Sequence, residues 1–240
     1  MSKESISDGD LQAAALSEPL IDGATGECAI AAGCTSATEL GTEVLVDPVV
    51  SRAKFDRELA DYATISKDQR RLGWWILSAE FPEVFVVFAA PQLRPSPVLF
   101  GARIDFTNYD LWPPSVRIVN PFTGTPYRYR ELSPTLTFMR RIPTSAPVQV
   151  PGLGVMEGYA EQPLLIAHGP DEIPFFCIPG VREYHNHPAH TGDSWFLHRQ
   201  LGEGKLFFLL EKLYRYGVEP LKAYQFGLQI AGFIRPESPL

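Results

Sequence analysis

The chain has 240 residues, of which 45% are apolar and 12% aromatic, a composition that supports a packed core and excludes wholesale disorder. Its 21 Lys and Arg against 28 Asp and Glu give a net charge of −7, which argues against a nucleic-acid binder with a broad basic surface. No apolar run approaches the roughly 18 residues of a membrane helix. We therefore expect a protein that binds neither nucleic acid nor a membrane.

Residues 1–47 differ in composition from the rest of the chain. They hold one basic residue, Lys3, nine acidic residues and no Phe, Trp or Tyr. A segment of this kind cannot bury enough apolar surface to offset its conformational entropy. The sequence therefore predicts an acidic flexible tail over residues 1–47 and a single domain over residues 48–240.

The cysteines and the N-terminus indicate a reducing compartment. Cys28, Cys34 and Cys177 are an odd number and form no CxxC pair, so a disulfide framework is not expected. Lys3 is followed by acidic residues, without the apolar stretch of a secretory signal. These features predict a cytoplasmic protein.

The domain is predicted to begin with a helix and to continue into a sheet. Phe55, Leu59 and Tyr62 recur at i, i+4 and i+7 after a candidate N-cap at Ser51, which predicts an amphipathic helix that ends before Gly73. Four apolar segments of strand length follow, separated by turn signals: residues 74–79, 84–90, 98–106 and 116–119. Turn signals this closely spaced predict an antiparallel meander.

The C-terminal part is predicted to be helical. Four leucines form an apolar stripe over residues 205–216, and Gly217 stands where such a helix ends. Residues 220–234 are predicted to form a second helix, whereas residues 125–175 are rich in Pro and Gly and are predicted to be largely irregular. The predicted class is α+β, with an N-terminal helix, a four-stranded antiparallel meander and C-terminal helices.

Residues suited to metal binding gather in one segment. Four of the five histidines fall within residues 185–198, shortly after Cys177. Thiolate, carboxylate and imidazole groups are ligands of Zn²⁺ in proteins. Glu183, His185 and His187 alternate, so an extended strand would project all three from one face. The sequence therefore makes Cys177 and these three residues candidate ligands of one Zn²⁺ ion.

Spacing leaves the ligand set open. A straight strand would separate residues 183 and 187 by about 13 Å at ~3.3 Å per residue, so we expect a bend. Pro179 and Gly180 would allow the chain to turn so that Cys177 returns to the same face. Alternatively, Glu183 orients a ligating imidazole, and His190 takes its place as a ligand.

Two enzymatic interpretations compete with a structural metal site. Cys177, activated by a neighbouring histidine, would be a nucleophile that carries a thioester. The sequence His185-Asn-His187-Pro is also similar to the HxHP core of JAMM-type metallopeptidases, which cleave ubiquitin-like proteins. The Asp that serves as the third zinc ligand in those enzymes is missing after Ser194.

Residues 101–121 resemble the strand-to-strand corner of ubiquitin-conjugating enzymes. That corner has a hydrophobic strand, an aromatic residue, Pro-Pro and Val, and this chain has Trp112, Pro113, Pro114 and Val116 in the same order. The order of helix, meander, corner, cysteine and C-terminal helices is similar as well. The resemblance implies a ubiquitin-conjugating-enzyme-like fold.

A second resemblance rests on Cys177, Glu183, His185 and His187. They match a bacterial family of predicted metal-binding proteins that is named for its Cys-Glu-His-His set (Metal_CEHH). The resemblance implies that these four residues are the metal ligands. It also implies gene neighbours that encode bacterial ubiquitin-like proteins with their activating and conjugating enzymes, in systems linked to phage defence.

Three functions follow from these resemblances and stay open at this point. The first is a zinc-binding, conjugating-enzyme-like component of a ubiquitin-like modification pathway, with the ubiquitin-like protein and its enzymes as partners. The second is a transferase that carries the ubiquitin-like protein as a thioester on Cys177. The third is a zinc hydrolase of ubiquitin-like conjugates, with Glu183 as its general base.

Overall fold

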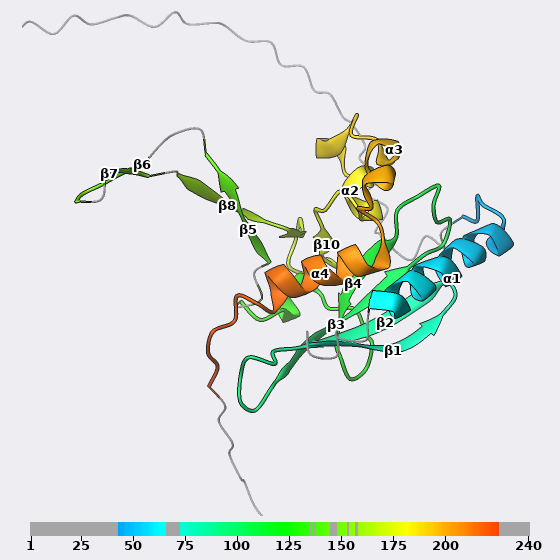
Figure 1. Cartoon of the computed structure of the whole chain (residues 1–240), viewed down its shortest axis with the longest axis horizontal. Helices are drawn as coiled ribbons and strands as arrows, with labels where there is room; N and C mark the ends of the chain where they lie inside the picture. Colours follow the sequence, from blue (N-terminus) through cyan, green and yellow to red (C-terminus); the bar gives the residue numbers. More distant parts are fainter. Residues whose placement is uncertain are drawn as a thin grey trace, which may run out of the picture. The chain divides into compact units, whose positions relative to one another are not determined.

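Helix α1 (Pro48–Ile65) leads into a four-stranded antiparallel sheet, as the sequence predicts. The predicted N-cap is wrong, because the helix begins three residues before Ser51, which is buried inside it. A computed structural model describes residues 43–65, 73–134, 136, 138–144, 148–152, 154–156 and 158–225. The strands pair in sequential order as a meander (Figure 1): β1 (Trp74–Glu80), β2 (Glu83–Ala89), β3 (Val98–Asp105) and β4 (Ser115–Val119). Together with the C-terminal helices, this arrangement confirms the predicted α+β class.

The core lies between one face of this sheet and the two longest helices, α1 and α4 (Leu206–Gly217). Side chains alternate across a strand, so Ala102 and Ile104 of β3 are fully buried whereas Arg103 between them is half-exposed. Phe88 and Phe100 stack within the core with ring centroids 4.7 Å apart. The predicted helix over residues 205–216 is therefore confirmed as α4, and its apolar stripe faces this core.

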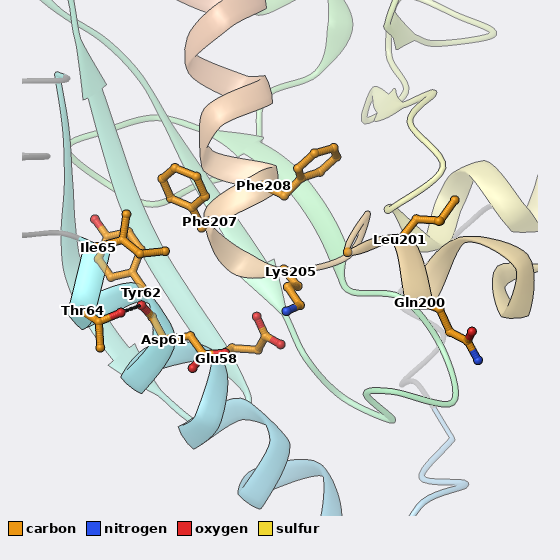
Figure 2. Close-up of a pocket in the computed structure, with 11 residues that line it drawn as sticks. Glu58, Asp61, Tyr62, Thr64, Ile65, Gln200, Leu201, Lys205, Phe207 and Phe208 are labelled. Atoms are coloured by element: carbon orange, nitrogen blue, oxygen red, sulfur yellow. Dashed lines mark hydrogen bonds between the residues drawn. The ribbon is translucent and has the colours of Figure 1, made fainter.

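A pocket of about 440 Å³ lies where α1 meets the start of α4. Figure 2 shows Tyr62 of α1 near Phe207 of α4, and Glu58 extending from α1 toward Lys205. Glu58 accepts a hydrogen bond from the backbone N–H of Leu206 at 3.2 Å, which satisfies one of the free donors at the start of α4. The two helices are therefore joined by a polar contact as well as by apolar packing.

The predictions for the two ends of the chain, a flexible tail and a second C-terminal helix, are only partly covered by the described residues. Residues 1–42 of the predicted tail lie outside the described residues, whereas residues 43–46 are bound to Asn108 by three hydrogen bonds. At the other end, residues 221–225 have no regular secondary structure. Residues 226–234 of the predicted second C-terminal helix lie outside the described part of the chain.

The segment predicted to be irregular contains several short strands. They form three antiparallel pairs: β5 (Met139–Pro143) with β8 (Tyr159–Pro163), β6 (Val148–Val150) with β7 (Gly154–Met156), and β9 (Leu165–Ile166) with β10 (Phe175–Phe176). A 3₁₀ turn, η2 (Tyr129–Glu131), precedes them. Strands of two to five residues are too short to show a clear alternation, and Pro143 and Pro163 within them hide the β pattern further.

After β10 the chain folds into a group of short helices (Figure 1). These are α2 (Arg182–Asn186), η3 (Pro188–His190), α3 (Trp195–His198) and η4 (Arg199–Leu201). Glu183, His185 and His187 do not project from one face of a strand, because most of residues 183–187 is α2; the straight strand is replaced by a helix rather than by a bent strand. Within the described ranges, no helix is long and apolar enough to cross a membrane.

Candidate functional site around Cys177

The position of Cys177 is fixed by its own backbone hydrogen bond and by a close approach of the chain three residues later. Its backbone N–H donates to the carbonyl oxygen of Leu164 at 2.7 Å, which extends the pairing of β9 and β10. Three residues later the chain passes so close to another loop that a Cβ on Gly180 would lie 2.0 Å from the carbonyl oxygen of Glu203. Only glycine fits at that approach. The thiol is therefore a buried group on a fixed turn.

Arg182 fixes α2 against the Pro-Pro corner between β3 and β4. Its side chain is only 10% exposed; Nη2 donates to the carbonyl oxygen of Thr107 at 2.6 Å, and Nη1 lies 3.4 Å from an Asp105 carboxylate oxygen. Its Nε and its backbone N–H donate to the carbonyl oxygens of Pro113 and Pro114. The corner thus anchors the helix that follows Cys177, a role that sequence reasoning missed.

Cys177 and His190 meet at the centre of the site. Cys177 Sγ lies 3.2 Å from His190 Nε2, across 13 positions of sequence. Burial raises the pKa of the Cys177 thiol, although the nearby Arg140 acts in the opposite direction. Burial and the neighbouring His187 lower the pKa of His190, so its imidazole is neutral and keeps a lone pair. The pair is thus a protonated thiol beside a neutral imidazole.

Glu183 and His185 point to different sides of α2. Each residue of an α-helix turns by about 100°, so positions two apart lie on nearly opposite faces. Glu183 accepts a hydrogen bond from the hydroxyl of Ser115 in β4. His185 faces the other way, with Nε2 2.5 Å from the carbonyl oxygen of Pro179 and Nδ1 2.8 Å from that of Asp193. Both of its nitrogens thus face backbone carbonyl oxygens, and a neutral imidazole donates to one of the two.

His187 lies beyond the end of α2 and stacks on other rings. Its ring is 5.2 Å from that of His168 and 5.3 Å from that of Phe175, nearly parallel to the former. The ring centroids of His187 and His190 are 5.9 Å apart. His187 Nδ1 accepts a hydrogen bond from the backbone N–H of Ala189 at 3.2 Å.

All five histidines of the chain belong to one continuous set of ring contacts, which we call the histidine cluster. Tyr184 is its centre, because it stacks on His190 at 3.8 Å and contacts His185 edge-on at 4.9 Å. The cluster consists of His168, Tyr184, His185, His187, His190 and His198. His168 and His198, which lie outside the candidate ligand set, are brought to this cluster by the tertiary fold.

Asp193 is the anionic partner of the cluster. Its two carboxylate oxygens accept hydrogen bonds from the hydroxyl of Tyr184 at 2.5 Å and from His198 Nε2 at 2.6 Å. These bonds lower the pKa of Asp193, whereas burial and this same carboxylate raise the pKa of Tyr184. No sequence pattern singles out Asp193, and its contacts to Tyr184 and His198 follow from the fold.

An apolar hollow of about 480 Å³ borders the cluster. Leu111 and Trp112 line it from the Pro-Pro corner, and Phe196 lines it from α3. His187 and His190 lie on its wall, so the rings next to Cys177 are accessible from this side. Glu183 lines a different pocket.

The donor chemistry fits zinc, and the fold brings two of the five candidate ligands together. A thiol and a neutral imidazole 3.2 Å apart are groups that one Zn²⁺ ion binds jointly. Among the described residues, however, no three His, Cys, Asp or Glu side chains are arranged around one ion as they stand. A complete site would therefore need rotation of at least one further side chain, for which His187 is positioned next to His190.

Comparison with known proteins identifies one family model and one relative that match most of the chain. Residues 46–221 match the family model described as Y4jH-like, Y4jH family. The chain is also 39% identical over 186 residues to a protein of Sinorhizobium fredii (strain NBRC 101917 / NGR234) named uncharacterized protein y4jH. That match covers 78% of this chain and 91% of the relative. The residues matched by the family model include the whole four-stranded sheet, Cys177 and the histidine cluster.

Proposed function

For this chain, which belongs to the Y4jH family, we propose the function of a zinc-binding, ubiquitin-conjugating-enzyme-like component of a bacterial ubiquitin-like protein modification pathway. The pathway acts in the cytoplasm, in defence against phage. The partners are the ubiquitin-like protein and its activating and conjugating enzymes. Cys177 and His190 are the two primary ligands of one Zn²⁺ ion.

The 3.2 Å contact between Cys177 and His190 carries the metal proposal. It lies inside a cluster that gathers all five histidines of a 240-residue chain. A buried thiol with a raised pKa is a poor nucleophile at neutral pH, whereas a metal ion deprotonates a coordinating thiol. Within this site the chain's own residues hold the thiol on a fixed turn and keep His190 neutral.

The order of elements supports the pathway part of the proposal. α1, the meander, the Pro-Pro corner, Cys177 and the C-terminal helices follow one another as the resemblance to conjugating enzymes implies. The corner also has a structural purpose here, because Pro113 and Pro114 accept hydrogen bonds from Arg182 and so position the helix after Cys177. Fold alone does not determine activity, which depends on Cys177 and the residues around it.

Metal analysis of the purified full-length protein tests the proposal. We expect about one equivalent of zinc per chain, because Cys177, His190 and a rotated His187 would bind a single ion. Cys177→Ala and His190→Ala should each lose most of this zinc. Cys28→Ala is the matched control, since it removes a thiol from the N-terminal segment, and it should retain the full equivalent. Glu183→Gln should also retain the metal, because Glu183 faces Ser115 and a different pocket.

The alternative function, a thioester carrier at Cys177, can be tested on the same purified protein by an assay for adducts with an activated ubiquitin-like protein. A thiolate held by zinc is a poor acyl acceptor, so the two functions compete for one sulfur atom. A metal-free protein that forms a reducible adduct with an activated ubiquitin-like protein, lost in Cys177→Ala, would contradict the zinc proposal. Zinc-loaded protein without such an adduct would support it.

A further inference from the structure

Two arginines face each other on the side of the sheet that α1 and α4 do not cover. Arg103 of β3 and Arg117 of β4 are direct partners in the antiparallel register. Their chain neighbours Ala102, Ile104 and Val116 are buried in the core, so the arginines project to the opposite face. Like charges directly opposite each other destabilise a strand pair. The sheet therefore contains a cross-strand pair of positive charges, Arg103 and Arg117, whose repulsion a bound anion would reduce.

The guanidinium groups of this pair are incompletely satisfied. Arg103 Nη1 forms an ion pair with Glu83 at 2.8 Å, but its Nε is buried without a hydrogen-bond partner. Arg117 is exposed, and its side chain has no ion pair or hydrogen bond to any of the residues that the structure describes. Arg117 thus offers free N–H donors at the surface, in the planar geometry that matches oxyanions, beside a guanidinium group of Arg103 that is only partly paired.

The turn after β4 is shaped around Arg103. Gly124 adopts a left-handed conformation with φ of +70°, and a Cβ there would lie 2.6 Å from Arg103 Nη2. Asn120 Oδ1 accepts hydrogen bonds from the backbone N–H groups of Phe122 and Thr123, which fixes the turn. Glycine at this position therefore leaves the space that the guanidinium group occupies.

These groups line a pocket of about 580 Å³, within the size range of small-molecule sites. Thr123 and Thr125 line it as well, and so do two carboxylates that are already neutralised, Glu83 by Arg103 and Asp105 by Arg182. Glu183 also lines the pocket; one of its carboxylate oxygens accepts from Ser115, and the other, Oε2, is buried with no hydrogen-bond partner among the described residues. The pocket therefore combines the free donors of Arg117 with a carboxylate oxygen of Glu183 that lacks a partner.

We propose that this pocket binds a small oxyanion, phosphate or carboxylate, between Arg103 and Arg117, with a hydrogen-bond donor of the ligand directed at Glu183 Oε2. The bound anion offsets the repulsion between the two arginines, and the donor satisfies the orphaned carboxylate oxygen. Cys177 and His190 do not line this pocket, so the proposal is independent of the zinc site.

Calorimetric titration of the full-length protein at neutral pH and low salt tests the site, with inorganic phosphate, glycolate and acetate as probes. Phosphate and glycolate each combine an oxyanion with a hydroxyl donor, and acetate lacks the donor. We expect saturable binding of phosphate or glycolate, with the tighter of the two identifying the anion class, and weaker binding of acetate. Arg117→Gln should weaken binding about tenfold, because it removes charge-assisted hydrogen bonds.

Arg141→Gln is the matched control, because Arg141 is a 75% exposed arginine of β5 and its loss changes the net charge equally. It should leave the affinity unchanged, whereas Gly124→Ala should reduce it by displacing Arg103. Without anion, Arg117→Gln should melt no lower than the wild type, because the mutation also removes the repulsion. Absence of saturable binding, or equal loss in Arg117→Gln and Arg141→Gln, would overturn the proposal.

Discussion

Glu58 is a carboxyl group placed inside the core by α1. Its side chain is 4% exposed, and it accepts hydrogen bonds from the hydroxyl of Tyr109 and the backbone N–H of Leu206. Burial raises its pKa above 4.5, although these hydrogen bonds and Lys205 act in the opposite direction. Desolvation therefore outweighs the partners that favour the charged form.

This raised pKa predicts a pH dependence of stability. A carboxyl group whose folded pKa exceeds its unfolded value contributes stability below the unfolded value of about 4.5, and this contribution is lost as the pH rises through the folded pKa. The wild type should therefore lose stability relative to Glu58→Gln over that window, by about 1.4 kcal/mol per unit of pKa difference. Chemical denaturation of both proteins across a pH series measures this.

Glu219→Gln is the control for the Glu58 experiment, because Glu219 is exposed. Its stability should follow that of the wild type at every pH. Parallel pH curves for the wild type and Glu58→Gln would show that the carboxyl group of Glu58 does not titrate differently in the folded protein.

At the scale of elements, the site depends on how closely the turn after Cys177 approaches the loop before α4. A Cβ at Gly180 would lie 2.0 Å from the carbonyl oxygen of Glu203, which is backbone and cannot rotate away. Gly180→Ala should therefore destabilise the protein by about 1–3 kcal/mol or more, as overpacking does. It should also reduce the zinc content, because the turn carries Cys177.

Gly169→Ala provides the matched comparison. A Cβ at Gly169 meets nothing closer than 3.9 Å, so its melting temperature and metal content should equal those of the wild type. Thermal unfolding and metal analysis of the two variants separate the effect of the close approach from that of adding a methyl group. Equal melting temperatures for both variants would mean that the 2.0 Å approach does not constrain the turn.

Element boundaries were predictable where the hydrophobic period is long. Phe55, Leu59 and Tyr62 place α1, and apolar segments bounded by Pro and Gly place β1 to β4. α2 has only five residues, and the alternation of Glu183, His185 and His187 is equally compatible with a strand. The position of α2 is set by the contacts of Arg182 to the Pro-Pro corner, which are 69 to 77 residues distant in sequence.

At the scale of the whole molecule, the start of the domain is tied to a buried asparagine. Asn108 is buried; its Oδ1 accepts hydrogen bonds from the backbone N–H groups of Leu45 and Val46, and its Nδ2 donates to the carbonyl oxygen of Glu43. Removing these partners would leave a buried amide unsatisfied, which costs about 1–3 kcal/mol. Residues 43–46 therefore support the domain that begins at α1.

Two truncations test this boundary. Deleting residues 1–42, which carry seven acidic residues and one basic residue, should leave the melting temperature and zinc content unchanged while raising the isoelectric point. Deleting residues 1–47 should lower the melting temperature, because Asn108 loses all three backbone partners. If both truncated proteins melt at the same temperature, the Asn108 contacts do not stabilise the domain.

The sequence by itself determined the helix, the meander and the segment that holds the candidate chemistry, because these follow from local hydrophobic period, turn residues and the clustering of histidines. Tertiary structure alone decided which donors meet. Cys177 contacts His190 rather than Glu183 because a helical turn sends Glu183 to Ser115, and strand register places Arg103 opposite Arg117. Contacts of this kind depend on how segments that are distant in sequence pack together, and local sequence patterns do not predict that packing.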